Sequence, residues 1–154
     1  MKIETTSFTP DGTIGDRYIA EAAGGENVNP ALAWSEVPEG TKSFALTIYD
    51  PDAPTGSGFW HWIVYNIPAD VREIAEGAGA PAGASEFPSD YGFAEYGGPN
   101  PPAGPAHRYI HTIHALPVEK LQAPEGITQA AIRFQIHTQQ LDSASVTGLY
   151  GQKA

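Results

Sequence analysis

Two aspartates held between prolines are the first residues in this chain whose types and spacing suggest chemistry. Asp50 and Asp52 stand two positions apart in the stretch DPDAP, so in an extended chain both side chains point to the same side. Pro51 fixes its own φ and biases Asp50 toward extended geometry. Carboxylates held this close repel each other unless a cationic or protonated group lies between them. The stretch therefore predicts either a basic group nearby or a rigid turn held by aspartate-to-backbone hydrogen bonds.

Two histidines and a tyrosine are the candidates to share a pocket with these aspartates. His61 stands in the stretch FWHW, and His107 follows a loop rich in glycine and proline. His107 and Tyr109 share the same parity, so both can face one pocket while Arg108 points the opposite way. We expect Arg108 to form a structural ion pair with an aspartate of this cluster. If the strands that carry them are neighbours, one pocket gathers Asp50, Asp52, His61, His107 and Tyr109.

Three segments are expected to be the strands that position this pocket. The first runs directly into Asp50, and a turn over residues 54–58 separates it from the second. The strands are expected at residues 43–49, 61–67 and 108–116, with weaker candidates at residues 2–8 and 13–20. Histidines 111 and 114, inside the third strand, are expected to be structural.

The second half of the chain is expected to contain a long loop and one helix. Nearly half of the residues between Gly77 and Ala106 are glycine or proline, and the aromatic residues among them are expected to order the loop by packing. Thr128 can cap a helix, whose apolar face is expected through Ala130, Phe134, His137, Leu141 and Ala144. The expected fold is mainly β: a two-sheet antiparallel β-sandwich with a late C-terminal helix, in one domain over residues 1–154.

Composition excludes several classes of function. The chain of 154 residues has no cysteine, so it has neither disulfides nor thiolate chemistry. Its formal charge of −10, with eight lysines and arginines, argues against nucleic acid and against an anionic membrane surface as partners. No apolar run approaches the roughly 18 residues of a spanning helix, and the first residues do not resemble a signal peptide. We therefore expect no membrane insertion and a cytoplasmic location.

Several motifs in order resemble the phosphatidylethanolamine-binding protein family, in particular its bacterial and archaeal branch of Raf-kinase-inhibitor-like proteins. They are NPALAWSEVPEGTKSFALTIYDPDAP, WHWIVYNIP, GPNPPAGPAHRY and, near the end, TGLYGQ. The resemblance runs from Asn29 to Tyr150. It implies a two-sheet β fold without a cofactor and with a small pocket for phosphate-like anions. Carried over residue by residue, the pocket comprises Asp50, Asp52, His61, Pro101, Pro102, His107 and Tyr109.

The same resemblance makes two local statements about the pocket. The bacterial branch usually has a cysteine between the prolines where this chain has Asn100, which changes the polarity at that point. The bond between Ala53 and Pro54 is expected to be cis, as in similar loops of the family.

Our hypothesis gives the aspartates a supporting role. Anions need hydrogen-bond donors, and carboxylates only accept, so Asp50 and Asp52 are expected to accept from His61 or His107. A carboxylate partner favours the cationic imidazole, which can hold a phosphoryl oxygen together with the Tyr109 hydroxyl. The protein would then be a non-enzymatic binder of a phosphate-like or phosphorylated small ligand, such as a phospholipid headgroup. The resemblance adds inhibition of a kinase or protease target and pairing as a homodimer.

Two other readings of the same residues stay open. One is a hydrolase or lyase that uses Asp50 or Asp52 with a histidine as an acid–base pair, although no G-x-S-x-G nucleophile motif occurs. The other is a zinc or manganese site built from Asp50, Asp52, His61 and His107.

Overall fold

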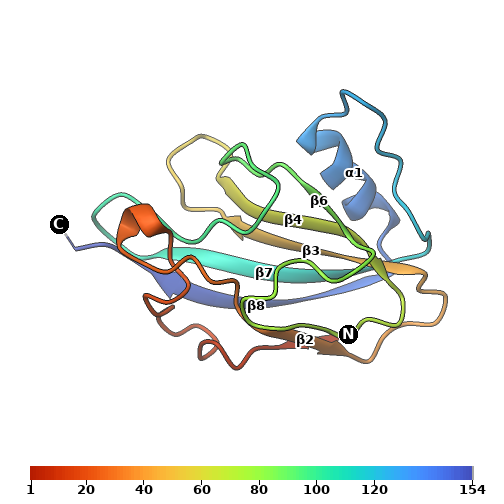
Figure 1. Ribbon diagram of the computed structural model, residues 1–154, viewed down its shortest axis with the longest axis horizontal. Helices are drawn as coiled ribbons and strands as arrows, with labels where there is room; N and C mark the ends of the chain where they lie inside the picture. The colour runs from red at the N-terminus through yellow and green to blue at the C-terminus, as the bar shows by residue number, and fades with distance from the viewer. Residues whose placement is uncertain (154) are drawn as a thin grey trace.

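A five-stranded antiparallel sheet forms the centre of the structure (Figure 1). The computed structural model describes residues 1–153, and the strands of this sheet lie in the order β6-β4-β3-β7-β8. Their bounds are β3 Ser43–Asp50, β4 Phe59–Pro68, β6 Ser85–Phe87, β7 His107–Leu116 and β8 Asp142–Tyr150. The three segments expected to be strands are therefore strands, each one to three residues longer than the alternation suggested.

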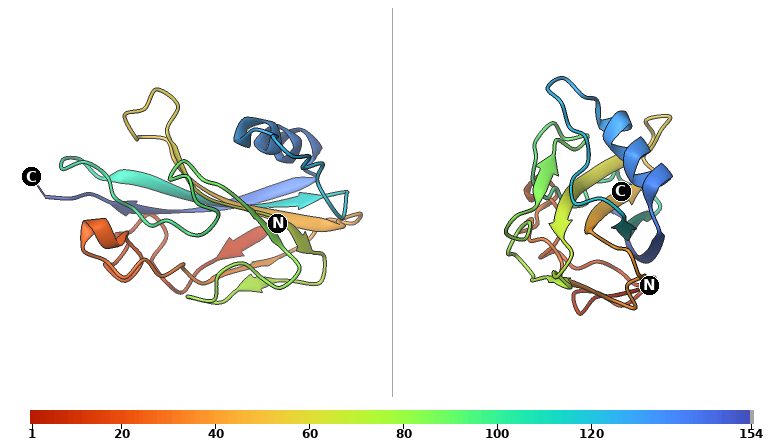
Figure 2. Two further views of the ribbon diagram at one scale, coloured as in Figure 1. Left: turned by 45° about the horizontal axis from the view of Figure 1, so that its top comes forward. Right: turned by 90° about the vertical axis from the view of Figure 1, so that its right-hand side faces the viewer.

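A smaller sheet and a helix cover the two faces of the five-stranded sheet (Figure 2). The smaller sheet has the order β1-β2-β5, with bounds β1 Lys2–Glu4, β2 Leu32–Ser35 and β5 Glu73–Ile74. The other elements are the 3-10 helix η1 Glu21–Ala23 and the helix α1 Gln129–Gln139. The mainly β fold with two antiparallel sheets and a late helix is thus confirmed.

Two layers of apolar side chains hold these faces together. Between the sheets, Trp34 of β2 packs on Phe44 of β3 with ring centroids 5.6 Å apart. Beneath α1, Ile132 and Ile136 pack against residues of β3 and β4 such as Ala45 and Ile63. Strand β3 is covered on both faces, and all but one of its residues are buried. A strand in that position needs apolar residues at consecutive positions, which the run FALTI supplies.

The weaker strand predictions were largely wrong. Strand β1 ends at Glu4, well short of residue 8. Residues 13–20 form a turn in which Tyr18 donates its backbone N–H to Gly15 at 3.1 Å, and only Thr13 makes a bridge, to Leu149. The apolar residues of this segment anchor a loop to the core instead: Ile14 and Ile19 are both buried.

The helix begins as expected but presents a different face. The Thr128 side chain accepts a hydrogen bond from the Ala131 N–H at 3.1 Å, which confirms the cap. The buried residues are Ile132 and Ile136, whereas Phe134 is 66% exposed. The predicted apolar face is therefore wrong, and His137, expected on that face, is exposed. The helix ends at Gln139, so Leu141 lies in the connection to β8 and Ala144 lies in β8 itself.

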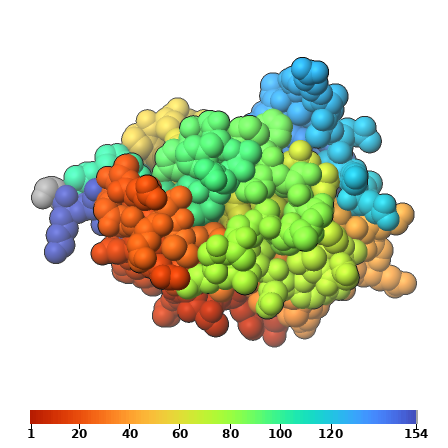
Figure 3. All heavy atoms as spheres, in the orientation of Figure 1, coloured from red at the N-terminus to blue at the C-terminus, as the bar shows by residue number. Residues whose placement is uncertain are grey.

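The loop between Gly77 and Ala106 is ordered by its aromatic residues, as expected. Tyr96 is buried edge-on against Trp62, with centroids 5.6 Å apart, and its hydroxyl donates to the Tyr18 carbonyl at 2.7 Å. In the space-filling view the loop, coloured lime to green, covers the middle of one face of the molecule (Figure 3). This loop supplies one wall of the pocket described next.

Candidate functional site

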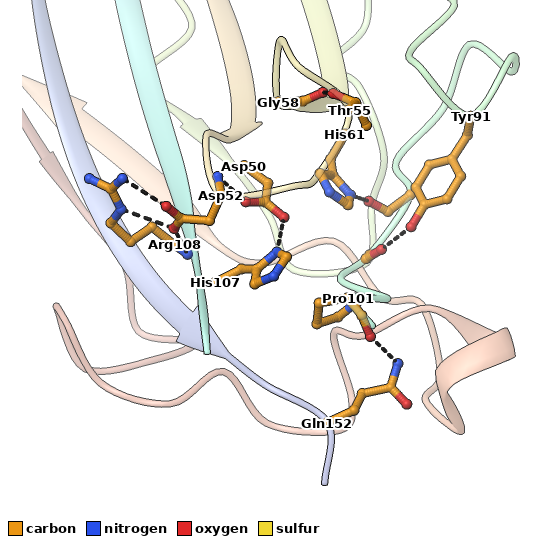
Figure 4. Close-up of polar contacts among 12 residues, drawn as sticks. Asp50, Asp52, Thr55, Gly58, His61, Tyr91, Pro101, His107, Arg108 and Gln152 are labelled. Carbon is orange, nitrogen blue, oxygen red and sulfur yellow. Dashed lines mark hydrogen bonds and ion pairs between the residues drawn. The ribbon is translucent and has the colours of Figure 1, made fainter. Parts of the chain in front are cut away.

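The antiparallel pairing of the central strands brings the predicted polar residues to one end of the sheet. Asp50, at the end of β3, pairs with Phe59 at the start of β4, and Tyr49 pairs with Ile110 near the start of β7. The end of β3 therefore lies between the beginnings of β4 and β7. His61 and His107 are carried to Asp50 by this register, as Figure 4 shows.

Asp50 and His107 form a close, nearly buried pair. The His107 Nδ1 lies 2.7 Å from Asp50 Oδ2, and the side chains are 12% and 3% exposed. The other Asp50 oxygen accepts the Asp52 backbone N–H at 2.8 Å. Because the carboxylate can only accept here, His107 donates through Nδ1 and its Nε2 is left without a protein partner among residues 1–153. Asp50 thus fixes the orientation of the His107 ring.

His61 is held by backbone rather than by a carboxylate. Its Nδ1 donates to the Gly97 carbonyl at 2.8 Å. Burial lowers the pKa of His61, although the Gly97 carbonyl and the Asp50 charge oppose this shift. The ring is therefore neutral near pH 7, with Nε2 as an acceptor. The expectation that a carboxylate accepts from a histidine holds for His107 and not for His61.

Tyr109 contributes a buried hydroxyl to the same end of the sheet. The residue is 1% exposed, and its oxygen is one of two buried side-chain polar atoms without a partner among residues 1–153. Burial, followed by the nearby Asp50 charge, raises the pKa of Tyr109, so the hydroxyl stays protonated. Its ring lies edge-on to His61, with centroids 5.2 Å apart. A buried donor without a partner is uncommon in folded proteins and calls for an explanation.

These residues line a small cavity of about 180 Å³. Six of the seven predicted site residues border it, namely Asp50, His61, Pro101, Pro102, His107 and Tyr109. The remaining walls are formed by Ala53, Pro54, Thr55, Phe59, Tyr91 and Asn100. Whether the six bind a ligand remains a prediction.

The sequence analysis missed Phe59 and Tyr91 in the cavity wall, and only Phe59 had a signal in the sequence. Phe59 shares the parity of His61 on β4, so the strand pattern contained the signal for it. Tyr91 lies in the long loop, where no periodicity indicates which way a side chain faces. Its hydroxyl donates to the Gly98 carbonyl at 2.7 Å, and burial raises the pKa of Tyr91 to about 12.

Asp52 is the predicted site residue that the structure leaves outside the cavity. The chain turns after Asp50 instead of continuing extended, so the two carboxylates do not point to the same side. Asp52 binds Arg108 through both oxygens, at 3.0 Å to Nε and 2.9 Å to Nη2, and also accepts the Arg108 backbone N–H at 2.9 Å. These hydrogen bonds lower the pKa of Asp52 to about 2. The expected ion pair of Arg108 with an aspartate of this cluster is confirmed.

At the site, the expected cis bond was wrong, and the alternative reading of a metal site finds no support. The Ala53–Pro54 bond is trans, as are all peptide bonds among residues 1–153. The turn closes instead through Asp50 and through a hydrogen bond from the Thr55 N–H to the Ala53 carbonyl at 2.8 Å. The four residues proposed as metal ligands do not converge, because Asp52 turns away to Arg108. No group of three or more potential metal ligands occurs within residues 1–153.

A strap from the C-terminal region ties down the proline wall of the cavity. Gln152 donates through Nε2 to the Pro101 carbonyl at 2.8 Å (Figure 4). The same Nε2 donates to Asn100 Oδ1 at 2.9 Å. The Gly104 N–H donates to the Gln152 carbonyl at 3.1 Å. Asn100 is thus engaged by this strap at the rim of the cavity.

Comparison with known proteins gives close matches over nearly the whole chain. Residues 4–151 match the sequence model of a family described as phosphatidylethanolamine-binding protein. The UPF0098 protein YbhB of Escherichia coli is 43% identical over 157 residues, which cover 97% of this chain and 99% of YbhB. A UPF0098 protein of Aquifex aeolicus is 38% identical over 154 residues, covering 97% and 88% of the two chains.

Solved structures show the same fold. The crystal structure of E. coli YbcL, described as a new member of the mammalian PEBP family, is 37% identical, with a TM-score of 0.93 over 99% of this chain and 98% of YbcL. The homologue CT736 of Chlamydia trachomatis is 29% identical, with a TM-score of 0.84 over 99% and 97% of the two chains. In the part of the chain that the structure describes, no helix is long and apolar enough to cross a membrane.

Proposed function

The chain belongs to the phosphatidylethanolamine-binding protein family, and from this premise and the geometry of the cavity we propose that it binds the phosphoryl group of a small ligand. In this proposal the protein is a binding and regulatory protein rather than an enzyme. The ligand's phosphoryl group enters the cavity beside His107, while the rest of the ligand stays outside, because about 180 Å³ is less than the roughly 300 Å³ that usually houses a whole small molecule.

The unpartnered Tyr109 hydroxyl is the observation that carries this proposal. It is a donor buried in a cavity wall, and an anionic oxygen would supply the acceptor that it lacks. His107 supplies a second donor, since Asp50 occupies Nδ1 and leaves Nε2 free. The proposal requires the imidazolium form of His107 in the complex, because only then is Nε2 a donor and the phosphate separated by a cation from the buried Asp50 carboxylate. Asp50 therefore orients and balances the donor, and does not touch the anion.

Calorimetric titration with O-phosphoethanolamine and with inorganic phosphate tests this function. Replacing His107 by alanine should abolish measurable binding, since hydrogen bonds to charged groups contribute about 1.5–3 kcal/mol each. His137→Ala is the matched control, because His137 is an exposed histidine that does not border this cavity. Unchanged affinity in His107→Ala would refute the assignment. Tighter binding of phosphoethanolamine than of phosphate would indicate a headgroup ligand, and equal binding would indicate phosphate alone.

A hydrolase remains the second candidate, because Asp50 and His107 at 2.7 Å form the pairing that an acid–base enzyme would use. The structure changes the residue to test, since Asp52 is held by Arg108 outside the cavity. A screen of phosphate esters and acyl esters with wild type and Asp50→Asn separates the two functions. Turnover by the wild type that is lost in Asp50→Asn would favour the enzyme, and absence of turnover with retained phosphate binding would favour the binder.

The proposal extends to a protein partner, a location and an oligomeric state. Inhibition of a kinase or a protease rests on family membership, and assays of purified kinases and proteases with added protein would test it. A cytoplasmic location and a homodimer are further parts of the proposal. Cell fractionation and analytical ultracentrifugation of the purified chain, respectively, would measure them.

A further inference from the structure

A second, larger cavity lies on the opposite face of the five-stranded sheet from the candidate site. It has a volume of about 370 Å³ and shares no lining residue with the cavity around His107. Its floor includes Tyr49 of β3, whose side chain lies on the other face of the strand from the adjacent Asp50. Its other wall is the helix α1. The volume falls within the range of roughly 300–1,000 Å³ typical of sites for small organic molecules.

The walls of this groove are mainly aromatic and apolar. Tyr49 and Trp60 stack on the sheet with ring centroids 4.1 Å apart and an angle of 23° between the rings. Facing them from the helix is Phe134, which is 66% exposed although Ile132 and Ile136 on the same helix are buried. Ile110 completes the apolar floor. A large aromatic surface is thus left uncovered on the helix, where it borders a preformed hollow.

Arg133 places a cation beside these rings, and this cation has no acidic partner among residues 1–153. Its guanidinium lies 4.5 Å from the centroid of Trp60, and its Nε donates to Gln129 at 3.1 Å. No carboxylate lies within 4.0 Å of it among residues 1–153, although the chain has 18 acidic residues and eight lysines and arginines. Stacking on Trp60 fixes the plane of the guanidinium, and Nη1 and Nη2 have no protein partner among residues 1–153.

His137 extends the polar edge of the groove by one helical turn. It lies four residues after Arg133, so both face the same side of α1, and both line the cavity. A preformed hollow with aromatic walls and a few polar groups at one side is the usual form of a small-molecule site. The charge of those groups determines which class of molecule fits.

We propose that the groove between α1 and the sheet binds a small amphipathic acid, with a planar aromatic body and one carboxylate. The aromatic body packs between Phe134 and the Tyr49–Trp60 pair, and the carboxylate accepts hydrogen bonds from the free Nη atoms of Arg133. A carboxylate matches the planar fork of a guanidinium better than a neutral amide does. This site is independent of the cavity around His107, and either site can exist without the other.

Titration with 2-naphthoate and with its neutral analogue 2-naphthamide, followed by calorimetry, tests the proposal. Wild type should bind the acid about tenfold more tightly than the amide, the difference expected for a charge-assisted pair at a half-exposed site. Arg133→Gln should abolish this tenfold preference and leave the amide affinity unchanged. Phe134→Ser should weaken both probes. Both residues are at least partly exposed, so thermal melts should show that the variants remain folded.

Two control variants remove a charge elsewhere. Arg72→Gln removes an arginine that lies 5.3 Å from the Phe44 ring, away from this groove, and should keep the preference for the acid. His107→Ala removes the proposed phosphate contact in the cavity around His107 and should also leave naphthoate binding unchanged. Three results would overturn the proposal: no naphthoate binding, equal affinity for acid and amide in wild type, or an unaltered preference in Arg133→Gln. A dimer that dissociates in Phe134→Ser would also overturn it, since a second copy would then occupy the groove.

Discussion

Replacing Tyr109 by phenylalanine should separate ligand binding from stability, because it removes one buried hydroxyl and little else. The hydroxyl has no protein partner among residues 1–153, so no internal hydrogen bond is lost with it. The ring packs edge-on against His61 at 5.2 Å, a contact that phenylalanine keeps. The substitution therefore tests whether the hydroxyl is present for a ligand rather than for the fold.

The two expected effects of Tyr109→Phe have opposite signs. A buried polar group without a partner costs roughly 1–3 kcal/mol, and a water in the cavity reduces this cost in the free protein. The free energy of unfolding should therefore rise by about 1 kcal/mol, which raises the melting midpoint by roughly 2–4 °C for a chain of this size. A donor lost to a bound phosphoryl group should weaken binding by about 1.5–3 kcal/mol, or roughly tenfold to a hundredfold.

Urea unfolding followed by tryptophan fluorescence, and titration with O-phosphoethanolamine, measure these two quantities on the same samples. Tyr91→Phe is the matched control with the opposite sign, because its hydroxyl donates to the Gly98 carbonyl and its loss should cost about 1 kcal/mol. A destabilised Tyr109→Phe would show that the hydroxyl has a protein partner, and Asp50, whose charge raises the pKa of Tyr109, would be the candidate. Unchanged phosphoethanolamine affinity would refute the role of the hydroxyl as a ligand donor.

Three further predictions concern the fold and its response to pH. Ile132→Ala should cost about 2–5 kcal/mol of unfolding free energy, whereas Phe134→Ser should change it by less than about 1 kcal/mol; similar losses in urea unfolding would mean that the buried face of α1 is misassigned. Burial lowers the pKa of His111 to about 4 from an unfolded value near 6.5. Near pH 5 the unfolded chain therefore binds a proton at His111 and the folded chain does not. The His111 contribution should therefore lower stability by about 2 kcal/mol from pH 7 to pH 5, and the slope should be shallower in His111→Gln. The hydrogen bonds from Arg108 lower the pKa of Asp52 to about 2, so this pair stabilises the fold above about pH 4 and ceases to do so as the pH falls toward 2. Because the pair is partly exposed, Asp52→Asn should cost about 1 kcal/mol or less at pH 6 and nothing at pH 2, and an equal difference at both pH values would contradict the linkage.

Strands covered on one or both faces could be read from the sequence, and those without an apolar signature could not. The run FALTI in β3 and the parity of His107 and Tyr109 in β7 gave both the strands and the facing of their side chains. Strand β8 was missed because its sequence DSASVTGLY is rich in small and polar residues. Its buried positions, Val146 and Gly148, do alternate, but a glycine carries no hydrophobic signal.

At the candidate site, the residues on strands could be predicted from the sequence, and those in turns and loops could not. Asp50, His61, His107 and Tyr109 lie on strands, so period-two reasoning together with the family motifs placed them in one cavity. Asp52 was misplaced because a single turn after Pro51 reverses the direction of its side chain, and local sequence does not reveal where an extended run stops. Tyr91 was missed because its position depends on loop packing that has no sequence period.

The strap at Gln152 determines when the proline wall of the cavity is held in place during synthesis. Gln152 leaves the ribosome after every residue that borders the cavity around His107. It also supplies the hydrogen bonds that hold the carbonyl of Pro101 and the side-chain amide of Asn100. The nascent chain can therefore pair β3 with β4 while the proline wall is still untethered. The tethered form of the proline wall therefore arises only after Gln152 has left the ribosome.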